Sequence, residues 1–187
     1  MRLNRSMATW VGMAICAWCP FVNAQPVSTE TTMARQVLVI PESIRREHEA
    51  IHSALIDATK VPGRVGAAAR ALAEVLHPHF VREEEIALPP LGLIAPLAAG
   101  QSLSDAVLAQ AETMTSALKA ELPKMLGEHV QIRAAVAALR QAAELEGASA
   151  QEELADELAL HARTEEEVLY PAAILVGDVI RARRQGP

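Results

Sequence analysis

Hydrophobic residues recur at helical spacing through most of the chain. Apolar stripes, with residues three or four positions apart, predict helical segments over residues 41–61, 64–88, 104–146 and 149–184. Prolines at positions 78, 123 and 171 predict kinks within these segments. The pattern is typical of an all-α protein. We expect an antiparallel up-down four-helix bundle, a single domain over residues 41–184.

The first 24 residues have the pattern of a secretory signal peptide. Arg2 and Arg5 precede an apolar run from Met7 to Val22, and Ala24 offers a cleavage site. The run is short for a membrane-spanning helix, although an uncleaved anchor is the alternative interpretation. We therefore expect a periplasmic or secreted protein. Its domain, preceded by a flexible leader over residues 25–40, should not be embedded in a membrane.

Removal of residues 1–24 would exclude several classes of function. The mature chain would have 163 residues, with 15 Lys and Arg against 23 Asp and Glu and a net charge of −8. This acidic balance argues against nucleic acid as a partner. Cys16 and Cys19 would be lost with the segment. Disulfides, thiolate catalysis and cysteine-ligated metal sites are then excluded.

The same arrangement of histidine and glutamate occurs twice in the chain. Each half contains a Glu-His pair and, further on, a histidine followed after four residues by a glutamate. The two histidines are 31 residues apart in one half and 32 in the other. The matched residues are Glu47, His48, His79 and Glu83 in the first half, and Glu128, His129, His161 and Glu165 in the second. Each half is thus predicted to be a helical hairpin, and two hairpins make the bundle.

Six of the matched residues lie in the apolar stripes, namely His48, His79, Glu83, His129, His161 and Glu165. Such groups are costly to bury unless something compensates them, and a metal ion would compensate all six. Residues four apart share a helix face, so each histidine of the His-x-x-x-Glu pairs can act together with its glutamate. Imidazole with carboxylate suits iron, manganese or zinc, and two symmetrical carboxylates can bridge a pair of ions. The sequence therefore predicts a metal site.

The remaining histidines and acidic residues near these motifs are less clear candidates. His52 lies four residues after His48, about 40° away around the helix, and is a candidate seventh ligand. His77 points away from His79, so a cap or surface position is expected. Tyr170, nine residues after His161, is expected on the opposite side of its helix. The neighbouring acidic residues should be solvated, namely Glu84, Glu85, Glu166 and Glu167.

At these motifs the chain resembles the hemerythrin family, in particular its bacterial hemerythrin-like domains. The resemblance covers roughly residues 41–180 and implies a four-helix bundle around a non-haem di-iron centre. It implies His48, His79, His129 and His161 as terminal ligands, with Glu83 and Glu165 bridging two Fe ions. The donor chemistry leaves manganese as the alternative metal. The oxygen carriers have a further histidine where this chain has Arg133. Their fourth-helix carboxylate is commonly an aspartate, five residues after the histidine rather than four.

The departures from the family predict an asymmetric centre. We expect the first half to offer His48, His52 and His79 to one ion, and the second half to offer His129 and His161 to the other, which would have an open position.

Several functions are compatible with such a centre. We expect the protein to bind O2, NO or peroxide for sensing, buffering or transport. The alternatives are an oxidoreductase acting on peroxide or NO, and periplasmic storage or delivery of metal. A helical interaction module without metal would leave the six buried groups unexplained.

Overall fold

The computed structural model describes residues 38–186, so the predicted signal peptide and most of the predicted leader lie outside the described residues. This part of the chain is all-helical and contains no strand, which confirms the prediction of an all-α protein. No helix within residues 38–186 has the length and apolarity needed to cross a membrane. In chain order the elements are α1 (Glu42–Thr59), α2 (Gly63–Ile86), the 3-10 helix η2 (Pro89–Leu93), α3 (Ile94–Ala98), α4 (Asp105–Glu146), α5 (Ser149–Thr164), the π-helical turn η3 (Glu165–Leu169) and α6 (Tyr170–Gln185).

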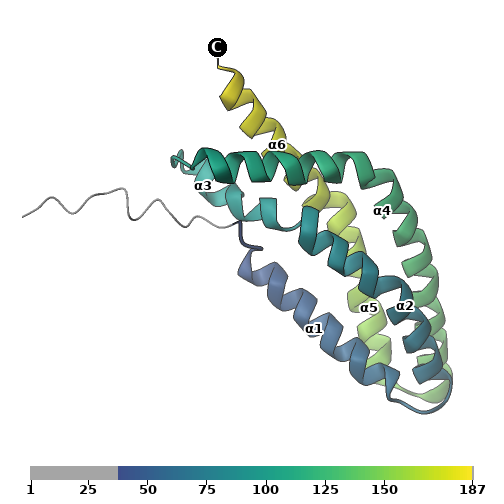
Figure 1. Ribbon diagram of the computed structural model, residues 1–187. Coiled ribbons are helices and arrows are strands. Elements are labelled where there is room, and N and C mark those ends of the chain that lie inside the picture. The colour runs from purple at the N-terminus through teal and green to yellow at the C-terminus, as the bar shows by residue number, and fades with distance from the viewer. Residues whose placement is uncertain (1–37, 187) are drawn as a thin grey trace, which may run out of the picture.

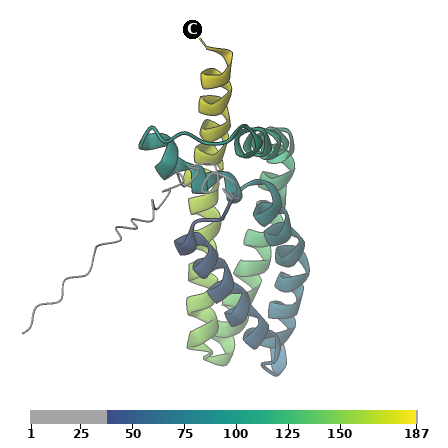
Figure 2. The same cartoon turned by 60° about the vertical axis from the view of Figure 1, so that its left-hand side comes forward.

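Four helical stretches pack into a bundle. α1 contacts α2 and α5, and α4 contacts α2, α5 and α6. Figures 1 and 2 show α1, α2, α5 and part of α4 lying side by side, while the rest of α4 and the end of α6 extend beyond them. The long helix α4 bends part-way along (Figure 1), and Pro123 is the proline inside it. A proline removes one backbone hydrogen bond of the helix, which accounts for the predicted kink.

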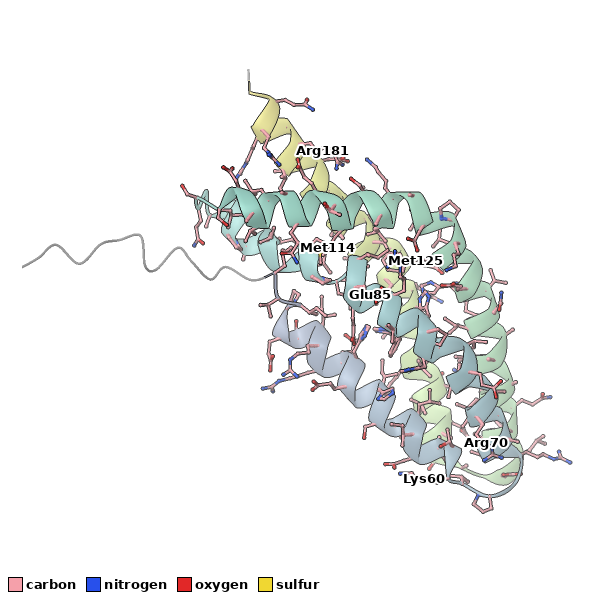
Figure 3. The ribbon with its side chains drawn as sticks, viewed as in Figure 1. Lys60, Arg70, Glu85, Met114, Met125 and Arg181 are labelled. Atoms are coloured by element: carbon pink, nitrogen blue, oxygen red, sulfur yellow. The ribbon has the colours of Figure 1, made fainter. Side chains whose placement is uncertain are left out.

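At the end of the bundle where α1 meets α2, hydrogen bonds join the start of α2 to the ends of α1 and α4. Arg70 of α2 donates to the carbonyl oxygen of Thr59, 2.7 Å away, at the end of α1. The Glu146 carboxylate, at the end of α4, accepts a 2.9 Å hydrogen bond from the backbone N–H of Arg64 in the first turn of α2. A carboxylate is favourable there because the first N–H groups of a helix lack partners within the helix. Figure 3 shows Lys60 and Arg70 at this end and Arg181 at the other.

Two apolar clusters fill the interior on either side of the predicted metal ligands. The first contains residues that follow His48 and His129 along their helices and precede Glu83 and His161, such as Leu55, Leu72, Leu139 and Leu158. The second lies beyond the ligands in the other direction and includes Leu88, Leu118, Met125 and Tyr170. The histidine and glutamate side chains therefore occupy a buried layer between two hydrophobic layers.

The segment between the predicted second and third helical segments, residues 89–103, closes the end of the bundle beyond the second cluster. It contains η2 and α3, whose Leu93 and Leu97 are buried with Leu38 and Val107 in a third cluster. Leu38, at the end of the predicted leader, is only 8% exposed. Residues 38–40 thus pack against the domain rather than standing away from it.

Close packing of α4 against α6 depends on Gly177. A Cβ atom at this position would lie 2.1 Å from Oγ1 of the buried Thr115. We expect Gly177→Ala to lower the free energy of unfolding by about 1–3 kcal/mol, because the helices must separate to admit the methyl group. At Gly127, on the exposed face of α4, a Cβ would meet nothing within 4 Å. Gly127→Ala should therefore stabilise the protein by about 0.5–1 kcal/mol through helix propensity.

Denaturant unfolding of the two variants measures both effects. A Gly177→Ala protein as stable as the wild type would show that the contact between α4 and α6 is looser than described.

Candidate metal centre

The buried layer brings together the six histidine and glutamate residues that the duplicated motif singles out. All six are at most 3% exposed: His48, His79, Glu83, His129, His161 and Glu165. Their ligand atoms form two groups, within each of which all the atoms lie within 4.8 Å of one another. One group contains His48 and His161, the other contains His79 and His129, and both contain Glu83 and Glu165. Each group could hold a metal ion.

The pairing of histidines differs from the expectation of one ion for each half of the chain. His48 lies beside His161, with ring centroids 4.9 Å apart, and His79 lies beside His129, at 4.6 Å. Each pair takes one histidine from each half, because α1 packs against α5 and α2 packs against α4. The expected division into His48 with His79 and His129 with His161 is therefore wrong.

Both buried carboxylates face the two groups at once. Oε1 of Glu165 lies 2.8 Å from Nε2 of His161 and 3.5 Å from Nε2 of His48, while its Oε2 lies 3.4 Å from Nε2 of His129. Glu83 is arranged in the same way: its Oε1 is 3.3 Å from Nε2 of His79 and its Oε2 is 4.0 Å from Nε2 of His48. A carboxylate whose two oxygens face two sets of imidazoles has the geometry of a bridging ligand.

Several ligand atoms lack any hydrogen-bond partner among the described residues. They are both ring nitrogens of His48, Nε2 of His161, Oε2 of Glu83 and Oε1 of Glu165. Unpartnered buried polar atoms cost free energy. Here they are all imidazole nitrogens and carboxylate oxygens, the donors that suit iron, manganese and zinc. The residues present thus fit a metal centre.

The environment moves the pKa values of the two carboxyl groups in opposite directions. Burial and the neighbouring charge of Glu165 raise the pKa of Glu83. Burial acts in the same sense on Glu165, but the adjacent imidazoles of His129, His161 and His48 outweigh it and hold the pKa of this carboxyl well below its usual range. Two carboxylates this close repel each other unless positive charge lies between or beside them.

An outer set of carboxylates surrounds the histidines, and it follows the same duplication. Nδ1 of His161 lies 3.0 Å from Glu47, and in the matching place Nδ1 of His79 lies 2.9 Å from Glu128. These contacts leave the Nε2 atoms facing the buried carboxylates. Carboxylates in this position fix the tautomer and orientation of a ligating imidazole. The sequence signal was the glutamate that directly precedes His48 and His129.

The prediction that Glu84 and Glu166 are solvated needs correction for Glu166. Its Oε1 lies 2.8 Å from Nδ1 of His129, and it also accepts from Arg133. Glu166 is 28% exposed, whereas Glu84 is 51% exposed and lies 3.5 Å from Nδ1 of His48. Both follow a bridging glutamate directly in the sequence, and both reach a histidine on a neighbouring helix rather than on their own. The angular position of a residue around its own helix does not show which residues of a neighbouring helix it contacts, so the sequence analysis could not find these two contacts.

Tyr170 is a member of the site that the sequence analysis placed on the wrong side of its helix. It is 1% exposed, its hydroxyl donates to Oε1 of Glu83, and the hydroxyl oxygen lies 3.3 Å from Nε2 of both His79 and His129. The π-helical turn at 165–169 explains the error. A π turn contains one extra residue, so the helix beyond it is rotated by about 100° relative to a regular α-helix.

The aromatic neighbours make the two groups of ligands unequal. Besides the shared Glu83, Tyr170 contacts the histidines of one group, His79 and His129, whereas Phe80 stacks on His48 of the other with ring centroids 4.3 Å apart. The residue that matches Tyr170 in the first half is the apolar Leu88. Burial and the charges of Glu83 and Glu165 raise the pKa of Tyr170 far above its usual range, so the phenol is protonated.

The structure does not bring His52 to the other ligands. His52 is exposed and absent from both groups, and its ring faces His77, with centroids 6.0 Å apart. The geometry gives each group two histidines and two shared glutamates. The expected asymmetry in the number of histidines, with an open position on the ion of His129 and His161, therefore has no support.

Comparison of the chain with models of known protein families, with curated proteins and with solved structures gave no match. The function is therefore inferred from the residues of the centre and the distances between them.

Two buried histidines make the stability of the metal-free protein depend on pH. Burial alone would lower the pKa of His79, but the hydrogen bond and charge of Glu83, with Glu128, raise it to about 9. Glu165 and Glu47 likewise outweigh burial and raise the pKa of His161 to about 9. Each imidazolium stabilises the folded state fully below the ordinary histidine pKa of about 6.5. This contribution is lost as the pH rises through about 9.

We expect the melting temperature of the metal-free protein to fall between about pH 7 and pH 10, followed by circular dichroism. The His79→Gln and His161→Gln variants should each show a smaller fall, because one raised pKa has been removed. The raised pKa values of the two histidines would be contradicted by a melting temperature that rises over this range. They would also be contradicted by variants whose melting temperature depends on pH as strongly as that of the wild type.

Proposed function

We propose that the protein is a non-haem di-iron protein of hemerythrin-like architecture, an antiparallel four-helix bundle that binds O2 or a related small ligand such as NO or peroxide. The observation that carries the proposal is the placement of Glu83 and Glu165, each with its two oxygens facing different histidine pairs. Two carboxylates shared by two sets of imidazoles suit a pair of ions better than a single ion. Manganese is the alternative metal.

The chain's own residues have distinct roles in this proposal. His48 and His161 would bind one ion, and His79 and His129 the other. The outer carboxylates orient the imidazoles by accepting from Nδ1, which keeps Nε2 as the ligand atom. The apolar clusters on either side exclude water from the layer. When bound, the ions would supply redox chemistry and positions at which a small molecule can bind.

An oxidoreductase acting on peroxide or NO is the second candidate, and Tyr170 favours it. A protonated phenol hydrogen-bonded to a bridging carboxylate is a proton donor within the site. It lies at only one of the two groups, so a ligand at the ion of His79 and His129 would meet a hydroxyl, whereas a ligand at the other ion would meet Phe80. Metal storage or delivery has no comparable feature in its favour. For either function we propose that the protein acts after export through the predicted signal peptide.

Purified protein reconstituted with Fe²⁺ without oxygen should contain close to two ions per chain. Glu83→Ala and Glu165→Ala should each lose most of this metal, because each removes a ligand shared by both groups. The matched controls are Glu85→Ala and Glu167→Ala, which remove exposed carboxylates outside both groups. Metal analysis by mass spectrometry gives the count. No metal in the wild type, or equal losses in all four variants, would refute the site.

Stopped-flow spectroscopy of the reduced, iron-loaded protein separates the two candidate functions. A spectral change with O2 that reverses when O2 is removed would support ligand binding. Repeated consumption of peroxide at a rate lowered at least about tenfold by Tyr170→Phe would support the oxidoreductase, since general acid catalysis contributes factors of this size or larger. A loaded protein that responds to neither O2, NO nor peroxide would leave storage or delivery of metal as the function.

A further inference from the structure

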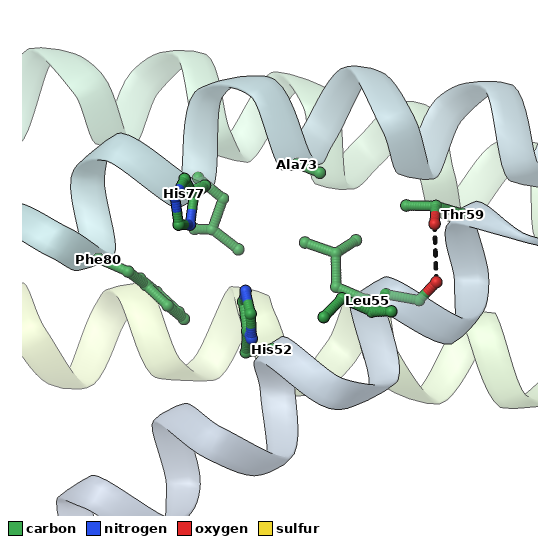
Figure 4. Close-up of a pocket in the computed structure, with 8 residues that line it drawn as sticks. His52, Leu55, Thr59, Ala73, His77 and Phe80 are labelled. Atoms are coloured by element: carbon green, nitrogen blue, oxygen red, sulfur yellow. Dashed lines mark hydrogen bonds between the residues drawn. The ribbon is translucent and has the colours of Figure 1, made fainter.

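All six histidines of the chain lie at or near the centre, but two of them take no part in either ligand group. His52 in α1 and His77 in α2 are both exposed and face one another where they line the small, largely apolar pocket of Figure 4. Their rings are 6.0 Å apart between centroids and are inclined by 31°. Two imidazoles that bind one ion at a tetrahedral angle have centroids about 5 Å apart, given bonds of about 2 Å to the metal. A small movement of the two exposed side chains would bring the pair to this spacing.

A second pocket beside these rings, not drawn in Figure 4, reaches His48 of the buried centre. It has a volume of about 190 Å³ and is lined by His48, Glu49, His52, His77, Phe80, Val81 and Glu84. His48 is 3% exposed, and neither of its ring nitrogens has a hydrogen-bond partner among the described residues. An unpartnered ligand of the centre thus forms the inner wall of a pocket whose rim carries two histidines and two carboxylates. On the other side of the pair, a largely apolar pocket lined by residues such as Leu55 and Ala73 offers no carboxylate.

The duplicated half of the chain lacks this arrangement. In the matching positions, Arg133 replaces His52 and Ala159 replaces His77. Arg133 donates to Glu166, so the carboxylate that corresponds to Glu84 is paired with a cation. Glu84 itself is 51% exposed and contacts only the imidazole of His48 among the ion pairs of the described chain. At these matched positions one half thus presents two imidazoles and Glu84, and the other presents a guanidinium, which would repel a cation. Glu49, at the rim of the same pocket, is already paired with Arg45 and is not counted among the metal-binding groups.

We propose that His52 and His77, with Glu84 at the rim, form a capture site for a divalent first-row metal ion and pass the ion inward to His48. The capture step draws on imidazole and carboxylate donors that bind such ions and on negative charge that attracts them. Transfer exchanges ligands one at a time and involves no redox change. The proposal depends on the function proposed above in so far as the buried centre must hold metal.

The rate of metal uptake tests the proposal separately from the amount. Metal-free protein is mixed with two equivalents of Fe²⁺ without oxygen, quenched with a chelator at increasing times, desalted and analysed for iron. We expect the His52→Gln/His77→Gln double variant to load about tenfold more slowly than the wild type, because the local concentration of ions at the pocket falls. Its final iron content should match that of the wild type.

The control is Glu153→Gln/Glu157→Gln, which removes two exposed carboxylates of α5 outside the pocket and should leave the rate unchanged. In a second arm, equilibrium dialysis of the iron-loaded proteins against Zn²⁺ should find one more Zn²⁺ ion on the wild type than on the histidine variant. Equal uptake rates, equal slowing by the control, or equal Zn²⁺ binding would overturn the capture site. Absence of iron from every protein would instead overturn the proposed di-iron function, and with it the relay.

Discussion

The structure depends on the burial of two carboxylates next to each other in the interior of a helical protein. Glu83 and Glu165 are at most 1% exposed and lie between layers of leucine, isoleucine and alanine. Two adjacent negative charges in such a medium destabilise the fold unless cationic partners neutralise them. Four imidazoles, a phenol and an outer set of carboxylates are positioned around this pair. In the proposed function two metal ions provide the remaining positive charge.

The all-α class and the six buried histidine and glutamate residues could be predicted from the sequence because both follow from helical periodicity. His79 and Glu83 are four residues apart in an apolar stripe, and His161 and Glu165 repeat that spacing. Side chains at this spacing share a face whatever the rest of the fold does. The duplication distinguished these residues from the many other glutamates of an acidic chain. Composition alone would not have identified them.

The features that escaped prediction all depend on relations between helices or on a local irregularity. The pairing of His48 with His161 requires knowledge of which helices adjoin. The contact of Glu166 with His129 requires it as well. Tyr170 enters the site because a π turn changes the helix phase, and no residue type in the turn marks it in advance. His52 shares a helix with His48, but the 40° offset that made it a candidate turns it towards His77 instead.

The crossed pairing of histidines has a consequence for the symmetry of the protein. Because each group of ligands takes one histidine from either half, a single hairpin holds only half of each group. Two copies of one hairpin related by a two-fold axis would reproduce both groups and both shared carboxylates. Joining such copies in one chain allows each half to change independently. Tyr170 opposite Leu88, and Arg133 opposite His52, are places where the halves have diverged, so chain fusion permits two chemically different positions within one duplicated frame.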